Sequence, residues 1–197
     1  MKKFLAMMMT AFMILTLSSC FPFDDGEDVI HVDPTAVPPT TREELYSYYN
    51  QVQRGMTKTE VEKLFGAGEV KLGEDGEETF TSYKNEKKSA GVNIIYAFDD
   101  TVHAKILYYN KAADLVPFCT PFDESKISEL KENMPVSEAT KVFGGEGLEI
   151  ACEYSANSPT GYSKILSWFN QDGSNFQIHT NNELIGQRVL SVDPSRR

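Results

Sequence analysis

Residues 45–66 read LYSYYNQVQRGMTKTEVEKLFG, and this stretch decides the expected fold because the chain carries a second version of it. At a constant offset of 78 residues it aligns with the stretch that ends LKENMPVSEATKVFG at residues 130–144, so that Met56 meets Met134. Self-similarity at a fixed spacing is the sequence signature of a repeated unit. We therefore expect two copies of one structural unit.

The first copy predicts two short helices in succession. Thr41 and Glu44 have the spacing of a capping box, and apolar residues then recur at the spacing of one helical face. Thr57 and Glu60 form a second capping box, so a second helix is expected to start there and to end at Gly66. The unit therefore begins with a helical hairpin.

The second copy keeps the apolar positions, although Pro135 replaces the capping threonine and Asn133 the turn glycine. Alternating strand signals follow both copies, at residues 79–84, 92–98 and 102–109 and then at 149–154, 164–170, 175–180 and 183–190. We expect an α+β fold: a tandem repeat of helix-helix-antiparallel strands that share one sheet, with the helices on one face. The first repeat would span residues 41–115 and the second 116–197.

The N-terminus predicts export from the cytoplasm. Lys2 and Lys3 precede an apolar run at residues 4–17 that contains no charge, which is typical of a secretion signal. This run is shorter than the roughly 20 residues that a helix needs to span a bilayer. A membrane-spanning helix is therefore the weaker interpretation.

The sequence LSSC at residues 17–20 resembles the lipobox of bacterial lipoproteins. We expect a signal peptide at residues 1–19, an acyl lipid on Cys20, and an acidic, proline-containing tether at residues 20–40 that holds the domain away from the bilayer. The alternative is a secreted protein in which Cys20 is unmodified. The expected location is the cell membrane or envelope, on the extracytoplasmic side.

Charge and cysteine content narrow the possible partners. The formal net charge is −10 and becomes −12 when Lys2 and Lys3 are removed with the signal. Such an acidic chain is a poor candidate for binding nucleic acid, whose phosphates require a basic face. Cys119 and Cys152 could form a disulfide in an oxidising compartment, and two buried free thiols are the alternative.

Alternation along residues 102–109 predicts which side of the sheet would bind a partner. If Val102, Ala104, Ile106 and Tyr108 face the helices, the alternate residues form an open face. With the neighbouring strands, the expected open face consists of Asn93, Ile95, His103, Lys105, Leu107, Tyr109, Gln177, His179, Ile185 and Gln187, and Trp168 is ambiguous because it alternates with Phe169. Aromatic, aliphatic and amide groups together are typical of protein recognition, although a merely solvated sheet face is the alternative.

The residues do not predict catalysis. His31 lies in the tether, and His103 and His179 fall in strands without an evident carboxylate or cysteine partner. Two histidines are too few to predict a metal site, and no phosphate-binding loop or zinc motif is present. We expect no enzymatic activity, no metal and no cofactor other than the lipid on Cys20.

Residues 49–61, YNQVQRGMTKTEV, and residues 184–188, LIGQR, resemble the beta-lactamase inhibitor protein family and, more loosely, the small outer-membrane assembly lipoproteins that share its half-unit. The resemblance implies a tandem fold whose open sheet face binds a protein. Inhibitory members insert an acidic residue from a loop of the first repeat. The corresponding loop here, residues 85–91, has no aspartate followed by paired tyrosines, so inhibition is not carried over. The paired cysteines that the family has within each repeat are also missing.

The sequence as a whole favours a membrane-anchored, non-catalytic, protein-binding lipoprotein. A structural lipoprotein of envelope assembly and a direct beta-lactamase inhibitor are the alternatives.

Overall fold

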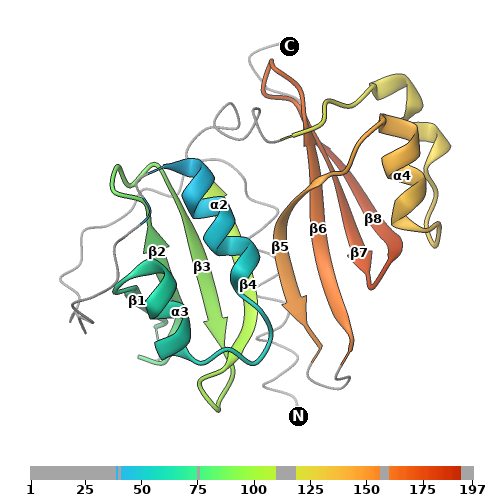
Figure 1. Ribbon diagram of the computed structural model, residues 1–197. Coiled ribbons are helices and arrows are strands. Elements are labelled where there is room, and N and C mark those ends of the chain that lie inside the picture. The colour runs from blue at the N-terminus through green and yellow to red at the C-terminus, as the bar shows by residue number, and fades with distance from the viewer. Residues whose placement is uncertain (1–38, 40, 75, 110–118, 156–159, 192–197) are drawn as a thin grey trace.

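The computed structural model describes residues 39, 41–74, 76–109, 119–155 and 160–191, and these form one antiparallel sheet of eight strands with few short helices (Figure 1). The strands lie in the sheet in the order in which they occur in the chain. They are β1 (Glu69–Leu72), β2 (Glu78–Lys84), β3 (Ala90–Tyr96), β4 (Val102–Tyr109), β5 (Leu148–Tyr154), β6 (Tyr162–Phe169), β7 (Asn175–Asn181) and β8 (Leu184–Ser191).

The helices are α2 (Arg42–Gln51), α3 (Lys58–Phe65) and α4 (Val136–Phe143), with a 3-10 helix, η3 (Glu124–Glu129). Both predicted capping boxes are present: the Thr41 and Thr57 side chains accept hydrogen bonds from the Glu44 and Glu60 backbone N–H groups. Each box satisfies N–H groups that the first turn of a helix leaves without partners. No side chain caps α4, because Pro135 stands at that position.

The predicted α+β fold of two helix-helix-strand repeats is wrong. The described residues form a largely β structure that the eight-stranded sheet dominates. The second helical hairpin does not form, because the six-residue η3 stands where a first α-helix was expected. The alignment at offset 78 reflects a more local likeness: Gly55 and Asn133 both have a positive φ, of 80° and 63°, in the turn before the next helix.

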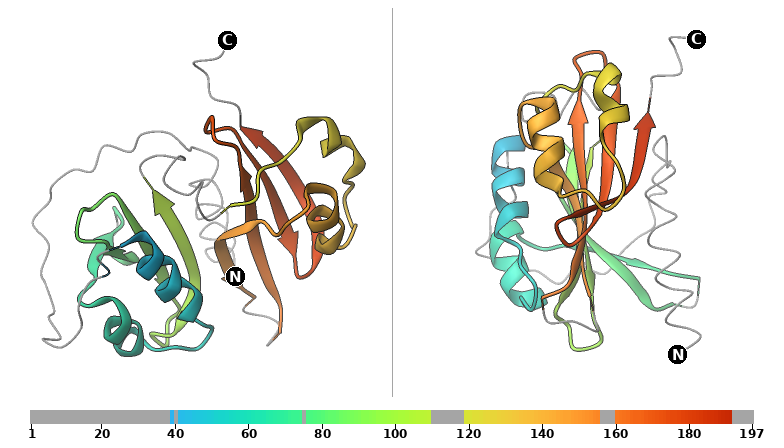
Figure 2. Two further views of the ribbon diagram at one scale, coloured as in Figure 1. Left: turned by 45° about the horizontal axis from the view of Figure 1, so that its top comes forward. Right: turned by 90° about the vertical axis from the view of Figure 1, so that its right-hand side faces the viewer.

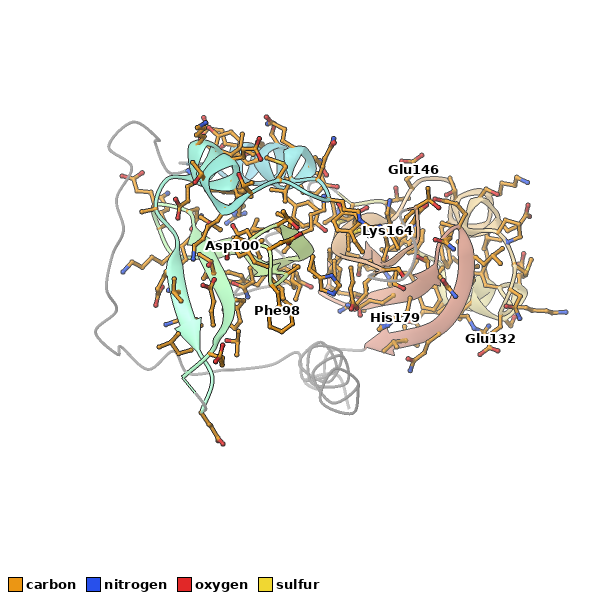
Figure 3. The ribbon with its side chains drawn as sticks, turned by 90° about the horizontal axis from the view of Figure 1, so that it is seen from below. Phe98, Asp100, Glu132, Glu146, Lys164 and His179 are labelled. Carbon is orange, nitrogen blue, oxygen red and sulfur yellow. The ribbon has the colours of Figure 1, made fainter. Side chains whose placement is uncertain are left out.

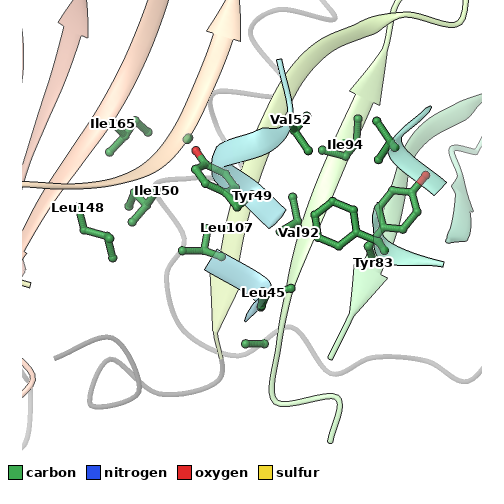
Figure 4. Packing of buried hydrophobic residues seen from close by; sticks show 14 of the residues in the cluster. Leu45, Tyr49, Val52, Tyr83, Val92, Ile94, Leu107, Leu148, Ile150 and Ile165 are labelled. Atoms are coloured by element: carbon green, nitrogen blue, oxygen red, sulfur yellow. The ribbon is translucent and has the colours of Figure 1, made fainter. Parts of the chain in front are cut away.

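The helices α2, α3 and α4 lie on the same side of the sheet, as the edge-on view in Figure 2 shows. Under α2, Leu45 and Tyr49 pack with Val92 of β3, Leu107 of β4 and Ile150 of β5 (Figure 4). A second apolar cluster lies under α4 and consists mainly of Leu130, Ala139, Trp168, Phe176, Ile178 and Ile185. The cluster under α2 therefore extends into β5 and β6, whereas the cluster under α4 lies within the second half of the sheet.

The two halves of the sheet meet where β4 pairs with β5. This pairing consists of three residue pairs, Ala104 with Glu153, Lys105 with Cys152 and Ile106 with Ala151. The β6–β7 pairing, by comparison, extends over seven residue pairs. The junction between β4 and β5 is therefore narrow.

The start of the described chain touches the sheet. Pro39, within the predicted tether, is buried, and its carbonyl accepts a hydrogen bond from the Glu86 backbone N–H at 3.2 Å. The predicted signal peptide, Cys20 and the boundary between residues 115 and 116 lie outside the described residues. In the part of the chain that is described, no helix has both the length and the apolar character needed to cross a membrane.

Candidate functional site

The predicted alternation of β4 is reversed over most of the strand. Ile95 pairs with Ala104 and Tyr96 pairs with Val102, so His103 is an extra residue that interrupts the register. Such a bulge changes the face to which the following side chains point. Lys105 and Leu107 consequently face α2 and are buried, whereas the open face was predicted for both.

Lys105 holds the end of α2 against the sheet. Its Nζ donates hydrogen bonds to the carbonyl oxygens of Tyr49 and Val52, each at 3.0 Å, and lies 4.2 Å from the centre of the Tyr49 ring. Both carbonyls lie at the C-terminal end of α2, where acceptors outnumber backbone donors, and the Tyr49 carbonyl also accepts a hydrogen bond from the Val52 backbone N–H at 3.2 Å. Burial lowers the pKa of Lys105, and the nearby carboxylate of Glu149 opposes that shift.

Three other predicted open-face residues also pack in the cores, Trp168 and Ile185 fully buried and Tyr109 partly buried. Tyr109 packs edge-on against Phe169 with ring centres 5.8 Å apart, and it belongs to the core under α2. Trp168 is fully buried in the core under α4, and its indole N–H donates to the Gly145 carbonyl oxygen at 3.0 Å. Ile185 is buried in the same core. Trp168 and Ile185 are therefore not available to a partner.

The remaining predicted residues are turned away from the helices. In β3, Val92 and Ile94 are in the core, so Ile95 points to the opposite side and is partly exposed. His103 Nε2 lies 3.5 Å from Glu153 Oε1 on that side. His179 is buried, and Gln187 is exposed. Figure 3 shows His179 on the side of the sheet away from α2 and α3.

The open face that the structure shows differs from the predicted one. It is the side of β3 and β4 turned away from α2, it consists of Asn93, Ile95, His103, Ile106 and Tyr108, and the name open face refers to these five residues from here on. By register, Asn93 pairs with Ile106, and Tyr108 pairs with Gly91. The Tyr108 hydroxyl lies 3.5 Å from the Ser82 side-chain oxygen, and the Tyr108 ring lies so close to Gly91 that a Cβ at position 91 would approach the ring atoms to 2.5 Å. Ile106 and Tyr108 were predicted to face the helices, so the bulge exchanges them with Lys105 and Leu107.

A groove of about 330 Å³ lies beside the end of α2, where α2, β4, β5 and β6 come together. We call it the junction groove. It is lined by Asn50, Val52, Gln53, Lys105, Glu149, Cys152, Tyr154, Tyr162 and Lys164. Figure 3 shows Lys164 close to the boundary between the two halves of the sheet. Of the residues predicted as a binding site or a disulfide, only Lys105 and Cys152 line the groove.

Glu149 links the charged groups of the junction groove. One carboxylate oxygen, Oε1, accepts a hydrogen bond from the Tyr49 hydroxyl at 3.2 Å and lies 3.4 Å from Lys105 Nζ. The other, Oε2, lies 3.0 Å from Lys164 Nζ. Burial disfavours the charge of Lys164, but the hydrogen bond and charge of Glu149 outweigh it and raise the pKa of this lysine. The Glu149 carboxylate thus forms ion pairs with two ammonium groups, those of Lys105 and Lys164.

Cys119 and Cys152 do not form a disulfide. Cys119 and Cys152 are free thiols, in the core under α2 and in the junction groove respectively. Burial raises the pKa of Cys119 to about 12 and contributes most to raising that of Cys152 to about 11. Since the thiolate is the nucleophilic form of cysteine, the raised pKa values make both thiols poor nucleophiles at neutral pH.

Within the described ranges, no three histidine, cysteine, aspartate or glutamate side chains are grouped so that they could hold a metal ion. The groups that gather at the junction groove are ammonium, phenol, amide and thiol groups around one carboxylate. Such groups suit recognition of a ligand.

Comparisons with known proteins give a likeness of fold. No family model matches the chain, and no curated protein matches its sequence. Among solved structures, the "putative beta-lactamase inhibitor protein" of Streptococcus mutans superposes with a TM-score of 0.51 at 12% sequence identity, over 77% of this chain and 98% of that one. At this identity the likeness concerns the fold alone, and the chain therefore has a fold like that of the Streptococcus mutans protein.

Proposed function

We propose that this protein is a lipid-anchored, extracytoplasmic module that binds another protein and catalyses no reaction. The observation that carries the proposal is the likeness of fold to the Streptococcus mutans protein, whose description is that of an inhibitor of a protein. An inhibitor of this kind has to contact its target. A fold does not determine a target, so the partner of this chain is left open.

The open face is the surface that we assign to the partner. Ile95, Ile106 and Tyr108 combine aliphatic and aromatic groups, and His103 beside Glu153 adds a polar margin. Interfaces typically bury apolar and aromatic side chains at their centre and keep polar groups at the rim. The open face already combines apolar and aromatic side chains with polar groups at its margin, so no rearrangement of the backbone is needed to form such an interface.

Anchoring by Cys20 is tested by removing the thiol that would accept the lipid. In a bacterial host, the Cys20→Ala protein should leave the membrane fraction and lose incorporation of labelled fatty acid, because two or more acyl chains are what hold such a protein on a bilayer. Cys119→Ala is the matched control and should stay with the membrane. Retention of Cys20→Ala in the membrane fraction would show that another part of the chain provides the anchor.

Binding through the open face is tested by cross-linking in intact cells. A photoreactive phenylalanine analogue replaces Ile95 in one variant and Ser47, an exposed residue of α2, in the control variant. We expect one discrete cross-linked partner from position 95 and none from position 47. Equal capture from both positions, or none from position 95, would contradict the assignment. A purely structural role in envelope assembly predicts no cross-linked partner from position 95.

Direct inhibition of a beta-lactamase is not part of this proposal. The β2–β3 turn is short and held closed, since Asn85 Oδ1 accepts hydrogen bonds from the backbone N–H groups of Ser89 and Ala90 at 2.9 and 3.2 Å. Its exposed residues are Glu86, Lys87 and Lys88. The turn therefore presents no aspartate with adjacent tyrosines, and the absence of inhibition stays a prediction.

A further inference from the structure

We propose that the junction groove is a second binding site, on the helix side of the sheet, and that it accepts the carboxylate of an acidic side chain in a peptide segment of a protein partner. The inference extends the proposed protein-binding function to a surface other than the open face. Its support comes from the charges, donors and shape of the groove.

The charge of the groove is opposite to that of the chain. Its lining holds two lysines and a single carboxylate, whereas the whole chain has a formal net charge of −10. Two ammonium groups share Glu149, at 3.4 Å for Lys105 and 3.0 Å for Lys164. An anionic group is what complements the remaining positive charge.

The two lysines are not equally available. The Lys105 side chain is only 6% exposed, and its three donors are directed at two backbone carbonyls and Glu149. The Lys164 side chain is 31% exposed, and its ammonium, which has three N–H donors, lies against Glu149 and 4.8 Å from the centre of the Tyr162 ring. Lys164 is therefore the group that contacts the ligand, and Lys105 forms part of the floor of the junction groove.

The rest of the lining fits a peptide. Tyr154 and Tyr162 supply aromatic surface, and the amide side chains of Asn50 and Gln53 lie at the exposed end of α2. The volume of about 330 Å³ lies at the lower limit of typical ligand sites, which run from about 300 to 1,000 Å³. The groove therefore takes one side chain and its flanking backbone.

A partner protein is favoured over a free anion as the source of the carboxylate. One partly exposed ion pair contributes about 1 kcal/mol at most, so a small carboxylate alone would bind very weakly. The acidic chain also repels free anions at long range. Within a protein interface, the same ion pair adds to other contacts and fixes their register.

The test uses the full chain, isotopically labelled and purified in a nonionic detergent, and a capped peptide, acetyl-Gly-Glu-Gly-amide, as the probe. Titration followed by NMR should shift the side-chain amide signals of Asn50 and Gln53. The matched peptide with Gln in place of Glu should bind about fivefold more weakly, a difference of about 1 kcal/mol. Lys164→Gln should remove this preference.

Lys58→Gln is the matched control, because Lys58 also pairs with a glutamate, Glu78, at 3.1 Å and lies 5.6 Å from the Tyr96 ring centre. It should keep the preference for the Glu peptide. The proposal is overturned by equal binding of the two peptides, by an equal effect of Lys58→Gln, or by the absence of any shift. Tighter binding of acetate or phosphate than of the Glu peptide would also overturn it and would identify a small-anion site. None of these results depends on the cross-linking at Ile95.

Discussion

Replacing Lys105 with methionine is expected to lower the free energy of unfolding by about 3–5 kcal/mol, because it leaves the partly buried Glu149 with one partner fewer and removes the ammonium donor from the Tyr49 and Val52 carbonyls at the end of α2. Methionine keeps most of the volume of the stem, so the loss reports the ammonium group rather than a cavity. Urea unfolding followed by far-UV circular dichroism measures the change.

Two controls separate this effect from the general cost of losing a lysine. Lys58→Met removes a half-exposed ion pair with Glu78 and should cost less than about 1 kcal/mol. The double variant Lys105→Met with Glu149→Gln should recover part of the loss, since the partly buried carboxylate charge that lost a partner is removed as well. A cost for Lys105→Met no greater than that of Lys58→Met would show that the buried ammonium does not hold α2.

Replacing Trp168 with alanine is expected to destabilise the protein by about 3–5 kcal/mol, the range for removing a large buried aromatic side chain. Trp168 is 0% exposed and packs against Phe143 and Phe176, with ring centres 5.3 and 6.3 Å away. The substitution also leaves the Gly145 carbonyl without its indole donor. Because Trp168 is the only tryptophan, circular dichroism rather than fluorescence measures the unfolding.

Phe98→Ala is the control for Trp168→Ala, because it removes an aromatic ring that is not part of a hydrophobic core. Phe98 is 91% exposed in the turn after β3, so this change should stay within about 0.5 kcal/mol. Equal effects of the two substitutions would mean that the core under α4 contributes little to stability.

The features that could be predicted from the sequence are those set by near neighbours in the chain. Thr41 with Glu44 and Thr57 with Glu60 mark the starts of α2 and α3, because a capping box needs only four consecutive residues. β4 was predicted with its exact bounds, 102–109, and the other predicted strands differ by one or two residues at their ends. β1 was missed, since its four residues are too few to show a period.

The orientation of β4 could not be predicted, because it depends on pairing with β3. The bulge at His103 has no local signal, and a lysine in a strand is ordinarily assigned to solvent. Lys105 is buried only because α2, distant in sequence, presents carbonyl oxygens to it. Assigning the alternation by polarity therefore placed Lys105 and Leu107 on the wrong face.

The junction groove was also beyond prediction from the sequence, apart from Lys105 and Cys152, which were named for other reasons. Glu149 and Lys164 come from neighbouring strands and meet Tyr49 of α2 only in the folded chain. The one available signal was the position of Lys164 in a strand with apolar neighbours at residues 165 and 166. That signal does not reveal which charged group lies opposite.

The narrow pairing of β4 with β5 bears on the order in which the molecule assembles. Every other strand pair joins segments that follow one another closely in the chain, whereas β4 and β5 are separated by residues 110–147 and share only three residue pairs. Closing a long loop costs entropy before its few contacts can form, so we expect the hairpins of each half to form first and this pairing last. Binding at the junction groove would then hold together the last part of the protein to fold.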